Sequence, residues 1–105
     1  MSYSYRHLYY FWVVAQEGGM SHAAARLGMA VQTVSAQVRE LEKALGCQLL
    51  KPAGRGVALT EAGQVAVRQA EQIFELGVSL SEPVRGAVDA ATGRRRVVMA
   101  DGLSK

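Results

Sequence analysis

The sequence has little of what secreted and membrane proteins depend on. It contains one cysteine, Cys47, in 105 residues, and a single cysteine cannot form a disulfide within the chain. No apolar run approaches the roughly 18 residues that a membrane span requires, and the N-terminus lacks a secretory signal. We therefore expect no contact with a membrane and a location in the reducing cytoplasm. Cys47, beside Gly46 and an apolar segment, is expected to be a small buried hydrophobic residue.

Groups for catalysis and for metal binding are missing as well. The sequence has no paired carboxylates in a catalytic pattern, no Cys/His or Ser/His/Asp arrangement, and no glycine-rich phosphate loop after a strand. Its two histidines and one cysteine are not spaced as metal ligands are. The expectation is a protein that is not an enzyme and has no catalytic residues, metal ions or cofactors.

The residues that are present fit one small globular domain with an appendage. Half of them are hydrophobic, and the net charge is +3. Residues 1–60 carry six Lys and Arg against three Asp and Glu, whereas residues 61–105 carry six of each. The excess positive charge therefore lies in the first part of the chain, which favours a polyanionic partner there.

Two helices are predicted before residue 29. The first spans residues 6–17, where apolar residues recur at helical spacing, and it ends at Gly18. The second begins at Ser21, whose hydroxyl can accept from the backbone N–H groups of the first turn. It ends at Gly28, since glycine adopts the left-handed conformation of a turn without strain. His22 lies in the first turn of this helix. It is predicted to be either a phosphate contact or an ordinary surface histidine.

A third helix is predicted from about Val31 to Leu45, and Gly46 ends it. Its buried stripe consists of Val34, Val38, Leu41 and Leu45. A second stripe, here called the DNA face, carries short side chains and one cation: Gln32, Ser35, Ala36 and Arg39. The major groove admits a helix whose side chains are small, and Gln, Ser and Arg can bond base edges or phosphates there. Residues 20–39 thus predict a helix-turn-helix, with Thr33 and Gln37 bordering the DNA face.

Residues 48–60 predict a β-hairpin. Two short apolar segments flank a glycine-rich tip that carries Arg55. Arg55 is expected to contact the DNA backbone or minor groove, and Lys51 is either a phosphate contact or a solubilising charge. A hairpin directly after a DNA-reading helix is the wing of a winged helix-turn-helix, so residues 1–60 form the predicted DNA-binding domain.

A long helix is predicted next, within residues 61–91. Thr60 caps it, and it runs from Glu61 to about Ser81, with Pro83 ending or kinking it. One stripe of this helix, here called the linker stripe, repeats at spacings of four and three: Ala66, Ala70, Ile73, Gly77, Leu80 and Val84. Such a stripe pairs helices, so we expect a homodimer through this linker helix.

Residues 92–105 read as a hinge followed by one strand, Val97–Leu103. A single strand cannot form a sheet by itself. We therefore expect the chain to stop just inside a second domain.

The order of these elements and several motifs resemble the LysR-type bacterial transcription regulators over roughly residues 6–80. The matching pieces are Leu8-Tyr9-Tyr10-Phe11 with Glu17-Gly18, Ser21-x-Ala23-Ala24-x-x-Leu27, Thr33-Val34-Ser35-x-Gln37-Val38-x-x-Leu41-Glu42-x-x-Leu45-Gly46, and Leu59-Thr60-Glu61-Ala62-Gly63. Within the family, Leu8–Trp12 and Gln32–Ser35 resemble the subgroup that activates sodium/proton antiporter genes. The resemblance implies that residues 92–105 begin an effector-binding domain, which would bind any small-molecule or ion effector.

This sequence departs from the family pattern at the start of the third helix. Many members have Ser, Gln and Pro where this chain has Ala30, Val31 and Gln32. Loss of the capping hydroxyl at Ala30 should lower the stability of the third helix by about 1 kcal/mol. Base reading would then pass to Gln32 and Thr33, or to a contact between Val31 and a thymine methyl group. Ala36 stands where an arginine often contacts phosphate in the family.

Together these patterns predict a mainly α-helical chain: a winged helix-turn-helix followed by a long dimerisation helix. The predicted function is sequence-specific binding of double-stranded DNA, at a pseudo-palindromic site, by a homodimer that regulates transcription. The alternative is an oligomerisation or interaction module that retains only weak non-specific affinity for DNA. Dimerisation without salt-dependent DNA binding would identify that alternative.

Overall fold

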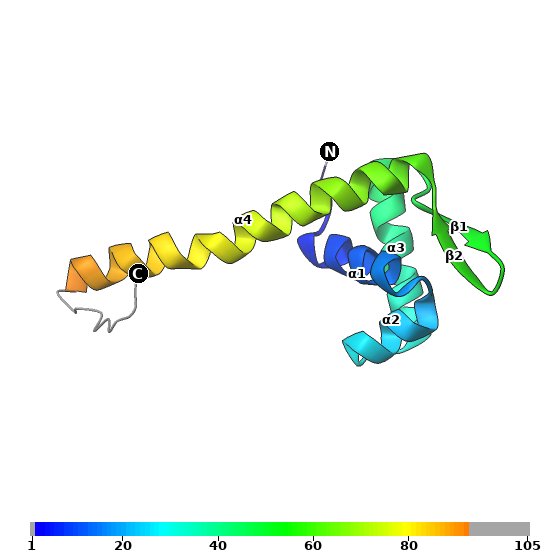
Figure 1. Ribbon diagram of the computed structural model, residues 1–105, viewed down its shortest axis with the longest axis horizontal. Coiled ribbons are helices and arrows are strands. Elements are labelled where there is room, and N and C mark those ends of the chain that lie inside the picture. Colours follow the sequence, from blue (N-terminus) through cyan, green and yellow to red (C-terminus); the bar gives the residue numbers. More distant parts are fainter. Residues whose placement is uncertain (1, 93–105) are drawn as a thin grey trace. The chain divides into compact units, whose positions relative to one another are not determined.

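The computed structural model describes residues 2–92. In chain order it contains α1 (Tyr5–Glu17), α2 (Met20–Leu27), α3 (Val31–Leu45), β1 (Leu50–Ala53), β2 (Gly56–Leu59) and α4 (Glu61–Thr92) (Figure 1). The chain divides into two compact units, Met1–Gln72 and Ile73–Lys105. Helix α4 contributes its first part to the first unit and its remainder to the second. The predicted fold, a winged helix-turn-helix followed by a long helix, is confirmed.

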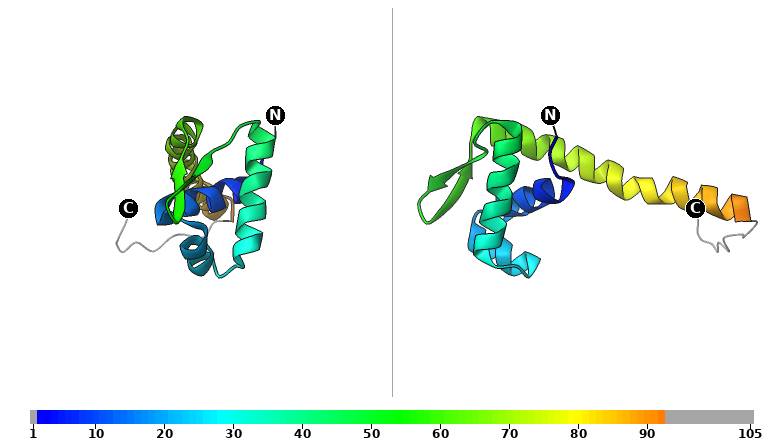
Figure 2. Two further views of the ribbon diagram at one scale, coloured as in Figure 1. Left: turned by 90° about the vertical axis from the view of Figure 1, so that its right-hand side faces the viewer. Right: turned by 180° about the vertical axis from the view of Figure 1, so that it is seen from behind.

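The core of the first unit lies between α1, α2 and α3. Helix α1 packs against both of the other helices, and α3 crosses it (Figure 2). The buried apolar residues come from all three helices, from the segment before β1 and from α4: Leu8, Phe11, Val13, Val14, Ala23, Ala24, Val34, Val38, Leu41, Leu49 and Ala70. Each large side chain among them contributes about 1.5–3 kcal/mol by leaving water. Their burial fixes α3 against the other helices and leaves its opposite side exposed.

The turn between α2 and α3 forms as the sequence predicts. Gly28 adopts the left-handed conformation, with φ 66°, and its N–H donates to the carbonyls at the end of α2. Ala24 is buried and its small side chain lets the helices approach closely. Helix α3 then spans Val31–Leu45 and ends at Gly46, the bounds expected from the sequence.

The start of α2 differs from the prediction. Ser21 was expected to cap this helix, but α2 begins at Met20 and Gly19 occupies the capping position without a side-chain hydrogen bond. The cause is the tight connection after α1, where the Gly19 carbonyl already accepts from the N–H of Ala23. Ser21 and His22 therefore lie exposed in the first turn of α2.

The hairpin forms the predicted wing. Strands β1 and β2 are antiparallel, with Leu50 opposite Leu59 and Ala53 opposite Gly56. Gly54 supplies the left-handed residue of the turn, with φ 59°, and Arg55 follows it. The tip of the hairpin projects away from the three helices (Figure 1).

The junction between the wing and α4 is closely packed. The Thr60 hydroxyl donates to the Gln48 carbonyl over 2.7 Å and accepts from the N–H of Gly63 over 3.0 Å. Thr60 therefore caps α4, as predicted, and also ties it to the segment that enters β1. Gly63 lies against the backbone of Leu49, in a space that leaves no room for a Cβ atom.

Two expectations outside the helix-turn-helix are wrong. Helix α4 continues through Pro83 to Thr92, so it does not end near Ser81; a proline removes one backbone donor, while the residues on both sides keep their helical bonds. Cys47 is exposed rather than buried. The chain turns at Gly46, and Leu49 enters the core in its place.

The strand expected at Val97–Leu103 lies outside the described residues. None of the helices within residues 2–92 combines the length and the hydrophobicity of a membrane-spanning segment.

Candidate nucleic-acid interface

The DNA face of α3 is available at the surface. Gln32, Ala36 and Arg39 are exposed and Ser35 is half-buried, whereas Val34, Val38 and Leu41 on the other side of the helix are buried. This separation follows from the sequence, because the two stripes occupy different sides of one amphipathic helix. The core thus holds α3 by one side and presents short polar groups and an arginine on the other.

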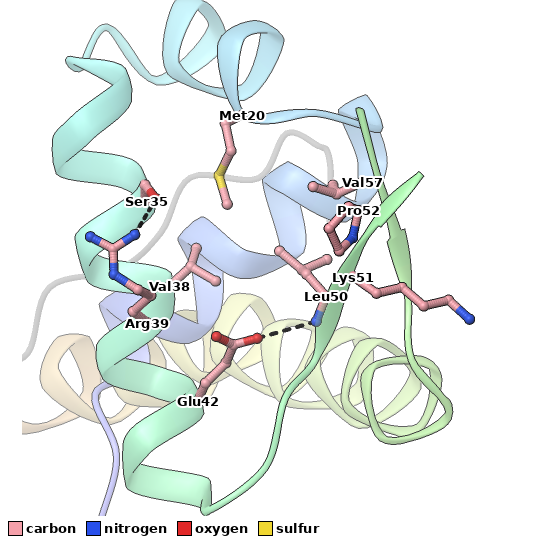
Figure 3. A pocket seen from close by; sticks show the side chains of 9 residues that line it. All are labelled: Met20, Ser35, Val38, Arg39, Glu42, Leu50, Lys51, Pro52 and Val57. Carbon is pink, nitrogen blue, oxygen red and sulfur yellow. Dashed lines mark hydrogen bonds between the residues drawn. The ribbon is translucent and has the colours of Figure 1, made fainter. Parts of the chain in front are cut away.

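Arg39 and Ser35 are linked within the DNA face. The Arg39 Nη1 donates a hydrogen bond to the Ser35 Oγ over 2.7 Å (Figure 3). Guanidinium has five N–H donors, so the group keeps donors for a base edge or a phosphate. The bond also orients the arginine before any ligand arrives, which lowers the entropy lost when it binds.

The first turn of α3 also faces solvent. Val31, Gln32 and Thr33 are exposed, and Ala30 caps the helix through its backbone alone, without a side-chain hydrogen bond. The N–H groups of Thr33 and Val34 both donate to the Ala30 carbonyl over 3.1 Å. The missing cap inferred from the sequence is therefore real, and the exposed Val31 side chain can meet an apolar group such as a thymine methyl.

Gln37 lies differently from the other candidates on α3. Its side chain is half-buried, and its Oε1 is buried without a hydrogen-bond partner within the described part of the chain. Ser35 is half-buried as well, but the buried Oε1 shows that the end of the Gln37 side chain lies towards the interior. Its position favours a packing role over contact with DNA.

A groove of about 180 Å³ separates α3 from the wing, and we call it the wing groove (Figure 3). Its lining is Met20, Ser35, Val38, Arg39, Glu42, Leu50, Lys51, Pro52 and Val57. The floor is mainly apolar, whereas Arg39 on the helix and Lys51 on the strand are exposed cations. Because Arg39 belongs to α3 and Lys51 to the wing, both sides of the groove carry a positive charge. The Lys51 side chain extends away from α3 (Figure 3).

Glu42 belongs to the sequence motif of the third helix, but no role is predicted for it there; in the structure it connects α3 to the wing. Its Oε2 accepts from the N–H of Leu49 over 2.8 Å. The same oxygen accepts from the N–H of Leu50 over 3.2 Å, the bond drawn in Figure 3. No local pattern signals this contact, because the partners lie seven and eight residues further along, beyond a turn. Arg55, at the other end of the wing, is exposed as predicted.

Comparison with known proteins identifies the chain. Residues 5–64 match the family described as bacterial regulatory helix-turn-helix protein, lysR family. The chain belongs to the LysR family. This LysR-family chain is similar to the transcriptional activator protein NhaR of Escherichia coli, with 40% identity over 81 residues that cover 77% of the chain and 27% of the relative. It is also similar to the uncharacterized HTH-type transcriptional regulator YfeR of Shigella flexneri, with 37% identity over 105 residues that cover 99% of the chain and 34% of the relative.

Solved LysR-family structures share the fold. The CbnR_DBD–DNA complex has a TM-score of 0.77 and 36% identity, covering 81% of this chain and 98% of that one. The BenM_DBD/catB site 1 DNA complex has a TM-score of 0.76 and 29% identity, covering 81% and 96% respectively. The chain spans between a quarter and about a third of the two curated relatives, 27% and 34%. Its membership of the sodium/proton antiporter subgroup stays a prediction.

A second group of contacts surrounds Trp12 in this LysR-family domain, where the sequence predicts packing of the long helix through Phe74 or of a partner subunit, and the contact that α4 makes comes from Glu71. The Tyr9 ring stacks on the Trp12 ring with centroids 6.1 Å apart, and the Arg26 guanidinium lies 5.6 Å from its centroid. The indole Nε1 donates to Glu71 Oε2 over 3.3 Å, and Arg26 pairs with Glu17 over 3.1 Å. These contacts join α1 to α2 and to the first part of α4.

The linker stripe divides between the two units. In the first unit Ala66 is half-buried and Ala70 is fully buried, so Ala70 packs against its own chain. In the second unit Ile73 is half-buried, and Gly77, Leu80 and Val84 are exposed. Leu76 and Val88 extend the exposed apolar part at a spacing of four: Leu76, Leu80, Val84 and Val88.

Proposed function

We propose that this chain binds double-stranded DNA in a sequence-specific manner, as a homodimer, and regulates transcription. The observation that carries the proposal is the DNA face of α3: an exposed, pre-oriented arginine and short polar side chains on a helix held from behind by the core. The relatives solved with DNA, CbnR and BenM, share this fold. A bacterial regulator of this kind works in the cytoplasm, where the chromosome lies.

Helix α3 supplies the sequence-reading contacts. The Arg39 guanidinium suits the O6 and N7 acceptors of guanine, and the Gln32 amide suits the N6 and N7 of adenine. Ala36 leaves room for the helix to approach the bases, and Val31 can contact a thymine methyl group. The Ser35 hydroxyl orients Arg39, so recognition rests on these side chains acting together.

The wing supplies contacts to the DNA backbone. Arg55 lies at the exposed tip and Lys51 is exposed on β1, which supports a role for both in neutralising phosphates. Ser21 and His22, exposed at the start of α2, are further candidates for the backbone. Phosphate contacts fix the register of the protein on the duplex and carry most of its salt-dependent affinity.

The second part of α4 supplies the dimer contact. An exposed row of Leu76, Leu80, Val84 and Val88 on one helix is typical of a surface that pairs with another helix. A two-fold dimer presents two copies of α3, so its site is pseudo-palindromic with half-sites related by the same symmetry. Any effector would act through a C-terminal domain of the longer protein.

A salt titration of DNA binding tests the proposal. We expect the chain to bind a fluorescein-labelled mixed-sequence duplex with an affinity that falls linearly with salt on logarithmic axes. Lys51→Ala and Arg55→Ala should each lower the magnitude of that slope by about one, because each removes one phosphate contact. Fluorescence anisotropy at several salt concentrations gives both the affinity and its salt dependence.

The matched control for this titration is Arg85→Ala, which removes an exposed cation of α4 outside the proposed interface with DNA. It should leave the salt slope unchanged. A dimer in sedimentation that binds no duplex at low salt would instead identify the chain as an interaction module.

A further inference from the structure

Glu42 is an acidic side chain in a surface that otherwise suits a polyanion. It lines the wing groove together with the cations Arg39 and Lys51. A carboxylate near the DNA phosphates weakens binding by charge repulsion, so its position needs another explanation. The carboxylate instead holds the start of the wing through hydrogen bonds to the backbone.

One oxygen of Glu42 accepts two successive backbone N–H groups where the chain enters the wing. The donors are the N–H of Leu49, at 2.8 Å, and the N–H of Leu50, at 3.2 Å. Strand β1 begins at Leu50, and Glu42 belongs to the part of α3 that follows the DNA face. Bonds to an ionised acceptor are about twice as strong as neutral ones, so this contact fixes β1 directly to the DNA-reading helix.

Strand β2, the other strand of the wing, is held by the end of α1. The N–H of Val57 donates to the Gly18 carbonyl at the end of α1 over 3.3 Å. Gly56 lies so close to the same carbonyl that a Cβ atom would collide with it. Strand β2 is thus anchored to α1, and Glu42 anchors β1 to α3.

We propose that Glu42 is a positioning residue that sets the wing relative to α3, so that the wing cations and the DNA face engage one duplex at the same time. The inference rests on the proposed DNA-binding function. Glu42 does not contact DNA in this account; it acts through Arg55 and Lys51, whose positions depend on where β1 begins. Without it, the wing loses its direct bonds to α3 and its cations bind at a higher entropic cost.

A double-mutant cycle between Glu42 and Arg55 tests the inference. Glu42→Ala is expected to weaken binding to a selected duplex by about tenfold in the otherwise unchanged chain. In the Arg55→Ala background the same substitution should cost less than about threefold, because the contact that it positions is already absent. Equal losses in both backgrounds would overturn the inference, since they would mean that Glu42 acts independently of the wing tip.

Two further variants separate hydrogen bonding from charge. Glu42→Gln removes the charge but keeps an oxygen that can accept both N–H groups, so it should restore most of the affinity lost in Glu42→Ala. Glu40→Ala removes the same charge from an exposed position on α3 and should not weaken binding. A Glu42→Gln variant as weak as Glu42→Ala would contradict the proposed role.

Hydrogen exchange gives a readout that does not require DNA. The amides of Leu49 and Leu50 should be protected in the wild-type chain and in Glu42→Gln, and should exchange faster in Glu42→Ala while the core amides of α1 stay protected. Unchanged exchange at both amides would overturn the contact itself. Failure of the wild-type chain to bind any duplex would instead overturn the proposed function, and the positioning role would fall with it.

Discussion

Arg39→Ala is expected to weaken binding to the specific duplex by about 10- to 100-fold, the cost of losing one well-placed contact to a base. The side chain is exposed, lies on the DNA face of α3 and is oriented by the Ser35 hydroxyl. Its loss should cost less on a duplex of scrambled sequence, because base contacts are made only at the correct site. Anisotropy titrations of both duplexes at one salt concentration measure the two losses.

Two variants sharpen this result. Arg39→Lys keeps the charge but not the planar fork, so it should recover non-specific binding and little of the specific affinity. Ser35→Ala should give a smaller loss than Arg39→Ala, because the arginine remains but is no longer held in place. An equal loss on the specific and scrambled duplexes would show that Arg39 contacts only phosphate.

Gly63→Ala is expected to destabilise the first unit by about 3 kcal/mol, at the upper end of the cost of overpacking. A Cβ atom at this position would collide with the Leu49 carbonyl oxygen and lie 3.1 Å from the Leu59 Cδ2. Leu49 cannot retreat easily, because its carbonyl accepts from the N–H of Thr60 and its own N–H donates to Glu42. For a domain of this size the melting temperature should fall by roughly 12–24 °C, which circular dichroism can measure.

Gly86→Ala is the matched control for this clash. Gly86 also lies within α4, but nothing stands within 4 Å of the position that its Cβ would take. Alanine favours helix over glycine by up to about 1 kcal/mol, so this variant should keep or raise the thermal stability. If Gly63→Ala unfolded at the wild-type temperature, the close packing between α4 and the wing would be wrong.

The helices and the wing could be predicted from the sequence because local rules determine them. The bounds of α3 follow from its apolar spacing and from Gly46, and the DNA face follows from the same spacing. The hairpin follows from a glycine-rich tip between apolar segments, which also placed Arg55 correctly. Features that depend on residues within one or two turns of each other are therefore within reach of sequence reasoning.

Contacts between distant parts of the chain were not predictable in this way. The bond from Trp12 to Glu71 joins residues 59 positions apart, and Glu42 reaches across a turn to the start of the wing. The exposure of Cys47 depends on which residue after Gly46 enters the core, and Leu49 does so. Pro83 shows the opposite case: proline disfavours the interior of a helix, yet α4 continues through it.

Selection from a pool of randomised duplexes tests the central claim, that α3 reads DNA sequence, most directly. The chain should enrich a motif with two-fold symmetry at two salt concentrations, and Gln32→Ala with Ser35→Ala should abolish the enrichment while salt-dependent binding remains. DNA binding without any enriched motif would contradict the claim, as would an unchanged motif in the doubly substituted chain.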